Sequence, residues 1–158
     1  MYGLKWLILI LAIPLYATSV DTDINQAAIQ AKKEHKHILL FLHKDNCGYC
    51  ERMLFQLDEK KIAQAIKADF VLLDINRDDE ETVAYEHFKG SNKAFLKELG
   101  VHFYPALVFI DPEQHKFIYN VSGYRNPTKT LTVLQYIRTK SYKKMTFEEF
   151  KDELSFAK

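Results

Sequence analysis

Cysteine is scarce in this sequence, because Cys47 and Cys50 are the only two among 158 residues. No second pair is available to cross-link the chain, so the fold must depend on its hydrophobic core for stability. Glycine and proline are also few, at 5 and 4 residues, and the chain has no repeats, low-complexity tracts or Gly/Pro-rich linkers. These absences give no sign of an internal domain boundary and predict one domain.

A strong charge of one sign is missing as well. The formal net charge is +1, which gives no reason to expect nucleic acid or an anionic membrane as a partner. Hydrophobic residues make up 47% of the chain and aromatic residues 13%, which is typical of a well-packed globular protein rather than a disordered one.

The longest apolar run lies at the N-terminus, where Lys5 precedes Trp6–Ala17. Its twelve residues fall short of the ~20 that a membrane-spanning helix needs. A basic residue, a short apolar core and the small residues Ala17 and Ser19 are typical of an export signal.

We therefore expect residues 1–17 to be a signal peptide and residues 18–158 to form a single domain in the periplasm. Cleavage is expected after Ala17, with the bond after Ser19 as the second choice. An uncleaved signal that anchors the protein to the membrane is the alternative. A lipid-anchored lipoprotein is excluded, since no cysteine lies near the cleavage point.

The two cysteines form the motif Cys47-Gly48-Tyr49-Cys50 between an apolar run that predicts a buried strand, His37–Leu42, and a predicted helix, Glu51–Leu57. At such a junction the first sulfur lies at a helix N-terminus, where unpaired N–H groups and the helix dipole favour a thiolate. A thiolate attacks disulfides, and a second thiol can close the ring and release the product. The motif predicts a dithiol–disulfide exchanger whose only redox group is its own Cys47–Cys50 disulfide, without a further cofactor.

Two other interpretations of the cysteines stay open. A structural disulfide would close a very short loop and so stabilise the chain little. Two thiolates with His43 would make a set of soft-metal ligands, but a closed zinc site needs four ligands and there is no second cysteine pair. Redox chemistry is favoured over both, and we expect no bound metal.

The order of apolar periodicities predicts an α/β fold. The expected helices are 21–36, 51–57, a second segment after a break at Asp58, which would cap it, then 92–99, 127–138 and 146–156; the expected strands are 37–43, 70–75, 106–110 and 116–121. Strands separated by helices imply parallel neighbours, and the last two strands form an antiparallel hairpin. We therefore predict a mixed central sheet with helices on both faces.

Two segments fall outside this core. Residues 77–91 start with acidic residues and form either a specificity-setting insertion or a solvated helix with a turn or two through Val83, Tyr85 and Phe88. The solvated helix is favoured, since runs of charge usually are solvated. The C-terminal helix, about 146–156, starts with a capping box and is expected to cover the core further.

The sequence resembles the thioredoxin superfamily over about residues 21–140, and more closely its exported bacterial branch, the periplasmic thioredoxin-like proteins of the SoxW and Dsb type. Four pieces carry the resemblance: Phe41-Leu42-His43 leading into the Cys-Gly-Tyr-Cys motif, the strand Phe70–Ile75, Gly100-Val101 followed by Tyr104–Phe109, and Gly123-Tyr124 before the closing helix. It implies a thioredoxin fold with an insertion and an extra C-terminal helix.

The resemblance also implies roles for the site residues. Cys47 would be the exposed nucleophile, Cys50 the buried resolving thiol, and Pro105 a cis-proline facing the disulfide. A proline there gives no N–H to the ladder and leaves the backbone of Tyr104 free to pair with a substrate strand. An ordinary proline at a strand start is the alternative for Pro105.

The residues between the cysteines tune the stability of the thiolate. Gly48-Tyr49 is the pair of the Dsb-type disulfide isomerase and of some periplasmic reductases. Tyr49 and Gly48 are therefore expected to contact substrate, together with Tyr104. The ring of Tyr104 would either line the substrate groove or pack beside Tyr49.

Two departures limit the resemblance. Cytosolic thioredoxin keeps a buried aspartate where this chain has Phe41, so another group or water must accept the proton of Cys50. The candidate groups are His43, as a proton shuttle, Asp45 and Glu51. The Dsb-type isomerase dimerises through a separate N-terminal domain, for which the roughly twenty residues before the first strand leave no room.

Together these features predict a periplasmic thiol–disulfide oxidoreductase that acts mainly as a reductase. A Dsb-type isomerase or oxidase is the alternative, and a non-enzymatic binder of metal or client proteins is less favoured. The expected partners are exported cysteine-containing proteins as substrates and a membrane electron donor that re-reduces the disulfide. Neither nucleic acid nor a further ligand is expected.

Overall fold

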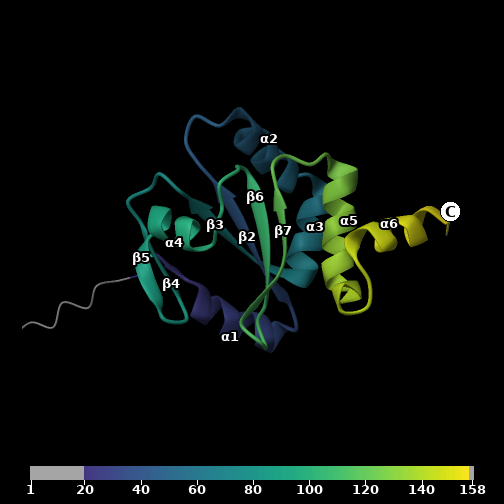
Figure 1. The fold of residues 1–158 in the computed structure, drawn as a ribbon, viewed down its shortest axis with the longest axis horizontal. Helices are drawn as coiled ribbons and strands as arrows, with labels where there is room; N and C mark the ends of the chain where they lie inside the picture. The colour runs from purple at the N-terminus through teal and green to yellow at the C-terminus, as the bar shows by residue number, and fades with distance from the viewer. Residues whose placement is uncertain (1–19, 157–158) are drawn as a thin grey trace, which may run out of the picture.

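In the computed structural model residues 20–156 are described, and the predicted signal peptide and its cleavage site lie outside them. A four-stranded sheet in the order β3-β2-β6-β7 crosses the molecule (Figure 1). Its strands are β2 (His37–His43), β3 (Phe70–Asn76), β6 (Ala106–Asp111) and β7 (Lys116–Ser122). β2 pairs parallel with β3 and antiparallel with β6, and β6 pairs antiparallel with β7. The predicted mixed sheet with its late hairpin is confirmed.

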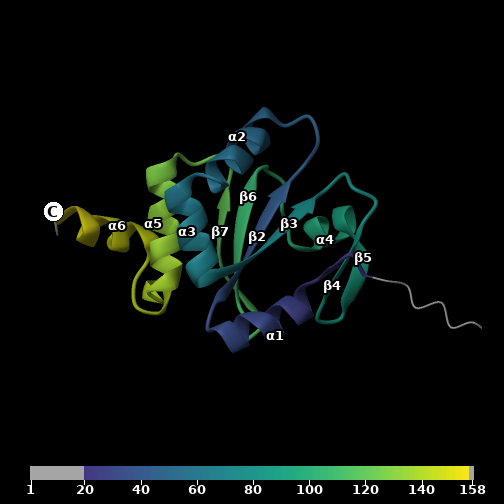
Figure 2. The ribbon, with the colours of Figure 1, turned by 180° about the vertical axis from the view of Figure 1, so that it is seen from behind.

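Helices cover both faces of this sheet, as Figures 1 and 2 show from opposite sides. One face carries α1 (Ile24–Glu34) and α4 (Asn92–Glu98), and the other α2 (Gly48–Leu57), α3 (Lys60–Asp69) and α5 (Pro127–Arg138). A 3₁₀ turn, Ser141–Lys143, leads to α6 (Phe147–Phe156), which packs on α5. Among residues 20–156 no helix is both long and apolar enough to cross a membrane.

The central strand β2 is apolar from Ile38 to Leu42, between a histidine at each end, and both of its faces are buried there. Leu39 and Phe41 belong to the core under α2, α3 and α5, whereas Leu40 and Leu42 belong to the core under α1 and α4. Successive side chains of a strand point to opposite faces, so a strand between two helical layers needs apolar residues at every position.

Side-chain caps fix where several helices begin. Asp23 caps α1 through hydrogen bonds from the N–H groups of Asn25 and Gln26, and the predicted box between Thr146 and Glu149 caps α6. The prediction for Asp58 was wrong, because α3 starts two residues later and Glu59 occupies its N-cap. Asp58 instead ends α2.

The segment 77–91 is not a solvated helix, and that prediction was wrong. β4 (Thr82–Tyr85) and β5 (Phe88–Ser91) form a hairpin, and β1 (Thr22–Asp23) adds a parallel strand to it. Val83 and Tyr85 are buried in alternation, which is the period of a strand, and the Asp21 carboxylate accepts hydrogen bonds from the N–H and hydroxyl of Thr82. The apolar alternation and the tie to Asp21 outweigh the acidic residues at the start of the segment.

Candidate active site

The two cysteines are joined at the N-terminus of α2, with 2.03 Å between the sulfurs and 5.2 Å between the Cα atoms. Cys47 is the N-cap residue, and its Sγ accepts the N–H of Cys50 at 3.3 Å. Cys50 is buried, whereas Cys47 is half-buried. When the disulfide is reduced, the sulfur of Cys47 therefore lies where unpaired helix N–H groups stabilise a negative charge.

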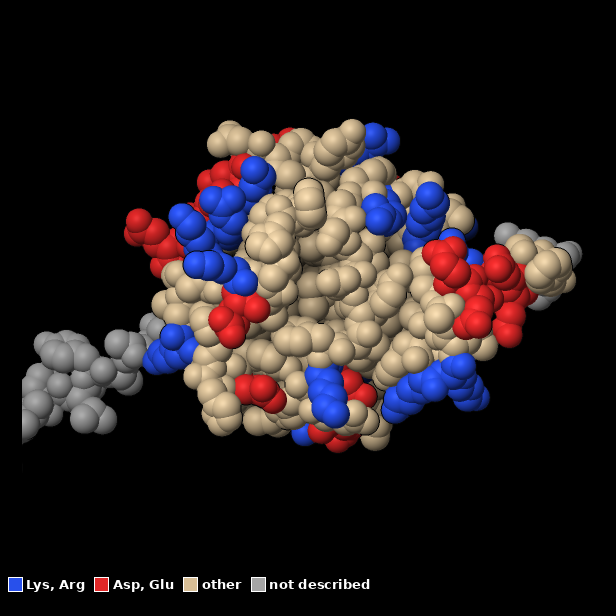
Figure 3. All heavy atoms as spheres, in the orientation of Figure 1, with Lys and Arg blue, Asp and Glu red and all other residues tan. Residues whose placement is uncertain are grey.

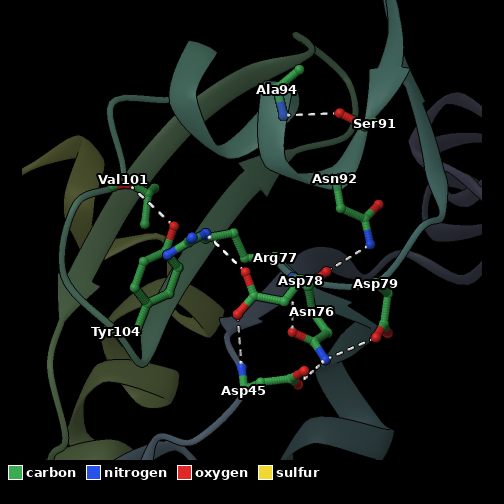
Figure 4. A network of polar contacts seen from close by, with 10 residues as sticks. All are labelled: Asp45, Asn76, Arg77, Asp78, Asp79, Ser91, Asn92, Ala94, Val101 and Tyr104. Carbon is green, nitrogen blue, oxygen red and sulfur yellow. Dashed lines mark hydrogen bonds and ion pairs between the residues drawn. The ribbon is translucent and has the colours of Figure 1, made fainter.

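A polar network holds the loop that enters α2 (Figure 4). The N–H of Asp45 donates to Asp78, and the Asn76 amide donates to the carboxylates of Asp45 and Asp79. The Nδ2 of Asn92, at the start of α4, donates to the backbone carbonyl of Asn76. The loop before the cysteines is thus tied to the end of β3, and the carboxylates of Asp45, Asp78 and Asp79 gather where the two meet.

The loop before β6 supplies the predicted proline. The Tyr104–Pro105 peptide bond is cis, and the carbonyl of Pro105 accepts the N–H of Gly123 at 2.7 Å. The Tyr104 ring packs against the core under α1 and α4, and its hydroxyl donates to the Val101 carbonyl. Burial raises the pKa of this tyrosine.

Tyr49, between the cysteines, pairs with Tyr124 rather than with Tyr104. The two rings stack with centroids 6.1 Å apart, and the guanidinium of Arg52 lies 4.8 Å from the centroid of the Tyr124 ring. On the sequence alone, Tyr124 was named only in the pair Gly123-Tyr124 before the closing helix, and Arg52 was given no role. Because Arg52 is two residues after Cys50 on the same predicted helix, the sequence could have placed it near the cysteines. Its contact with Tyr124 could not be predicted, because Tyr124 comes from a loop that is distant in the sequence.

His43 ends β2 on the same face as Phe41, and their rings stack with centroids 5.1 Å apart. Its Nε2 lies 2.7 Å from Oδ1 of Asp74 on the neighbouring strand. The hydrogen bond with Asp74 raises the pKa of His43, although partial burial opposes this. His43, one of the proton acceptors named from the sequence, therefore has a carboxylate partner in the structure. This partner, Asp74, was not predicted from the sequence.

The sequence of this domain matches a known protein family. The family model described as a thioredoxin-like domain matches residues 24–138. The chain belongs to the thioredoxin-like family. No curated protein matches the sequence.

Solved structures with the same fold agree with this thioredoxin-like assignment. A thioredoxin-fold protein from Helicobacter pylori is 26% identical, with a TM-score of 0.65 over 76% of this chain and 80% of that one. The oxidoreductase DsbH (19% identity, TM-score 0.53, 87% of this chain and 96% of that one) and the C-terminal domain of DsbD from Neisseria meningitidis (22%, 0.52, 71% and 91%) share the fold.

A thioredoxin-like domain with a Cys-x-x-Cys disulfide at a helix N-terminus is built for exchange between thiols and disulfides. The protein is a thiol–disulfide oxidoreductase. Among residues 20–156 no group of three or more His, Cys, Asp or Glu side chains is arranged to hold a metal ion.

The pairing of His43 with Asp74 makes a prediction for pH dependence. A histidine whose pKa is raised by folding adds stability below its unfolded pKa, about 6.5, and this stability is lost as the pH rises through the raised value. Asp74→Asn should therefore lower the pKa of His43, followed by NMR, and destabilise the thioredoxin-like domain at acidic but not at alkaline pH. The control Asp152→Asn, on α6, should do neither; an unchanged His43 pKa in Asp74→Asn contradicts the pairing.

Proposed function

We propose that this thioredoxin-like protein is an exported, periplasmic oxidoreductase that mainly reduces protein disulfides. The Cys47 thiolate attacks one sulfur of a substrate disulfide, and the other substrate sulfur leaves as a thiol. Cys50 then loses its proton and attacks Cys47, which releases the second substrate thiol and closes the Cys47–Cys50 disulfide. Two electrons pass to the substrate, and a membrane electron donor returns two to the protein.

Two carboxylates that lie close to the cysteines along the chain support the proposal that reduction is the main direction. Glu51 lies in the first turn of α2, and Asp45, tied to Asn76 beside Asp79, lies in the loop before it. Carboxylates near a thiol disfavour the thiolate. A dithiol whose reduced form is less stabilised gives up its electrons more readily, so it is the stronger reductant.

The reduction potential of the Cys47–Cys50 couple tests the direction, by equilibration in dithiothreitol and glutathione buffers with thiol trapping. We expect a value closer to the reducing end of the superfamily range, roughly −270 mV, than to the oxidising end, roughly −120 mV. Asp45→Asn and Glu51→Gln should each make the couple more oxidising, whereas the control Asp58→Asn, at the far end of α2, should not. A potential near the oxidising end assigns the protein to the oxidases or isomerases instead.

The proposal of export rests on the N-terminal sequence. Lys5, the apolar run Trp6–Ala17 and the small residues at its end match the pattern of a signal peptide. Expression of the full chain in a bacterium, followed by fractionation and N-terminal sequencing, tests it. The proposal expects periplasmic protein that begins at Thr18. Full-length protein in the membrane fraction supports the anchored form, and full-length protein in the cytosol contradicts export.

A further inference from the structure

The strand β7 forms one edge of the central sheet, with β6 on its inner side. An edge strand carries N–H and carbonyl groups on its outer side that can pair with another extended chain. In Figure 3 the surface over β6 and β7 is hollowed and uncharged, with Lys and Arg side chains beside it toward α5 and a group of Asp and Glu side chains farther out, over α6. The sheet has a second edge at β3, but the hollow in this view lies over β6 and β7.

Two cavities flank this edge. One, of about 450 Å³, lies toward α4 and is lined mainly by apolar residues such as Leu99, Val108 and Phe117, with Glu98 as its one charged residue. The other, of about 720 Å³, lies toward α5 and α6. Both include Tyr119 and Asn120 in the middle of β7. Since α4 and α5 cover opposite faces of the sheet, the cavities lie on opposite sides of the strand.

We propose that an extended segment of the protein substrate adds to the free edge of β7 and places alternate side chains in these two cavities. The proposal rests on the proposed function, since it names the substrate surface that the reductase recognises beyond the reacting disulfide. Main-chain hydrogen bonds to the edge give affinity, and the pockets for alternate side chains give specificity.

The edge of β7 leads directly to the disulfide. Ser122 at its end pairs with Ala106, and the next N–H, that of Gly123, donates to Pro105. Tyr124 lines the cavity toward α5 and α6 and stacks on Tyr49 between the cysteines. At about 3.3 Å per residue, a substrate segment within a few residues of its reacting cysteine covers the strand.

The charge of the second cavity selects the side chains that it accepts. Arg125, Lys129 and Lys151 line it together with a single carboxylate, Glu148, which pairs with Lys151. The helix α6, which lies beyond the family match at residue 138, supplies two of these four. The segment that fits therefore alternates acidic residues, facing α5, with apolar residues, facing α4.

A second copy of this chain fits the edge less well. Its own β7, Lys116–Ser122, carries a lysine and no carboxylate that could pair with the basic cavity. Charge complementarity therefore favours a substrate segment over self-pairing through the same strand.

The experiment uses synthetic peptides that contain one cysteine, which is joined by a disulfide to a fluorescent thiol. On either side of this cysteine the peptide has a six-residue flank in which Asp and Val alternate. Release of the fluorophore by the reduced protein gives kcat/KM. N-methylation of one set of alternate backbone amides should lower kcat/KM roughly tenfold, because the hydrogen bonds to β7 are lost, while methylation of the other set should have little effect. Replacing Asp by Lys in the flank should lower it by a similar factor.

A charge-reversal variant tests the basic cavity. The double variant Lys129→Glu/Lys151→Glu should abolish or invert the preference for the Asp peptide, and the control Lys140→Glu/Lys143→Glu, at the opposite end of α5, should retain it. Hydroxyethyl disulfide, which has no flank, should be reduced at the same rate by all variants. If the native protein does not reduce hydroxyethyl disulfide, the proposed function itself is overturned. If all peptides are reduced at equal rates, or if the protein forms a dimer in solution that buries β7, only the docking of substrate on this edge is overturned.

Discussion

Replacing Cys47 with serine is expected to abolish the reduction of insulin disulfides, lowering the rate by at least about a thousandfold. Cys47 is the more exposed of the two sulfurs and lies at the N-cap of α2, so it is the one that a substrate disulfide can reach. A serine hydroxyl at the same position does not form the thiolate on which the exchange depends. Turbidity from precipitating insulin chains, with dithiothreitol as the electron source, measures the rate.

The matched variant Cys50→Ser separates the nucleophile from the resolving thiol. It retains Cys47, so it should still attack the substrate but then stop as a mixed disulfide, because the buried thiol that would release it is missing. Non-reducing gel electrophoresis should show this adduct for Cys50→Ser and none for Cys47→Ser. Retention of insulin reduction by Cys47→Ser, or adducts formed with equal ease by both variants, would reverse the assignment of the two sulfurs.

The central sheet was predictable because its two inner strands, β2 and β6, are buried on both faces and so are apolar at almost every position. β3 is partly exposed, but its residues Phe70–Leu73 form an apolar run that also predicts a strand. The hairpin of β4 and β5 was not predicted, since its strands have four residues each and the segment starts with charges. What makes it a hairpin is the burial of Val83 and Tyr85 against helices that are remote in the sequence.

At the site, the sequence predicted the residues of the local motif and missed those that the fold brings to it. Asp74 reaches His43 only through the register of two parallel strands, in which Phe41 pairs with Asp74. One signal was present, because Asp74 is the single charged residue in an otherwise apolar strand. The contact of Arg52 with Tyr124 could not be predicted from the sequence, because arginine and tyrosine are both common on protein surfaces.

The register of β2 also explains what replaces the aspartate of cytosolic thioredoxin. Phe41 stands at the matching position, is 1% exposed and packs in the core with Met53 and Leu57. The carboxylate of this chain lies instead on the adjacent strand, as Asp74, where it is half exposed and bonded to His43. The position on β2 is thus used for packing, and the His43–Asp74 pair lies at the end of β2 and on the edge strand β3.

Phe41→Asp is therefore expected to destabilise the fold severely, by about 3–5 kcal/mol or more, even though it restores the residue that cytosolic thioredoxin has there. Removing a buried phenyl ring alone costs about that much, and the introduced carboxyl adds the penalty of burying a charge. Chemical denaturation followed by circular dichroism measures the loss, and the control Phe41→Leu, which keeps the site apolar, should lose less than about half as much. Burial raises the pKa of the introduced carboxyl, so the variant should be least impaired below about pH 4, and its loss of stability should grow as the pH rises from there to the raised value. A variant as stable as the native protein at pH 8 would mean that the Asp74–His43 pair already provides a polar environment at this position, and that Phe41 is not required for the core.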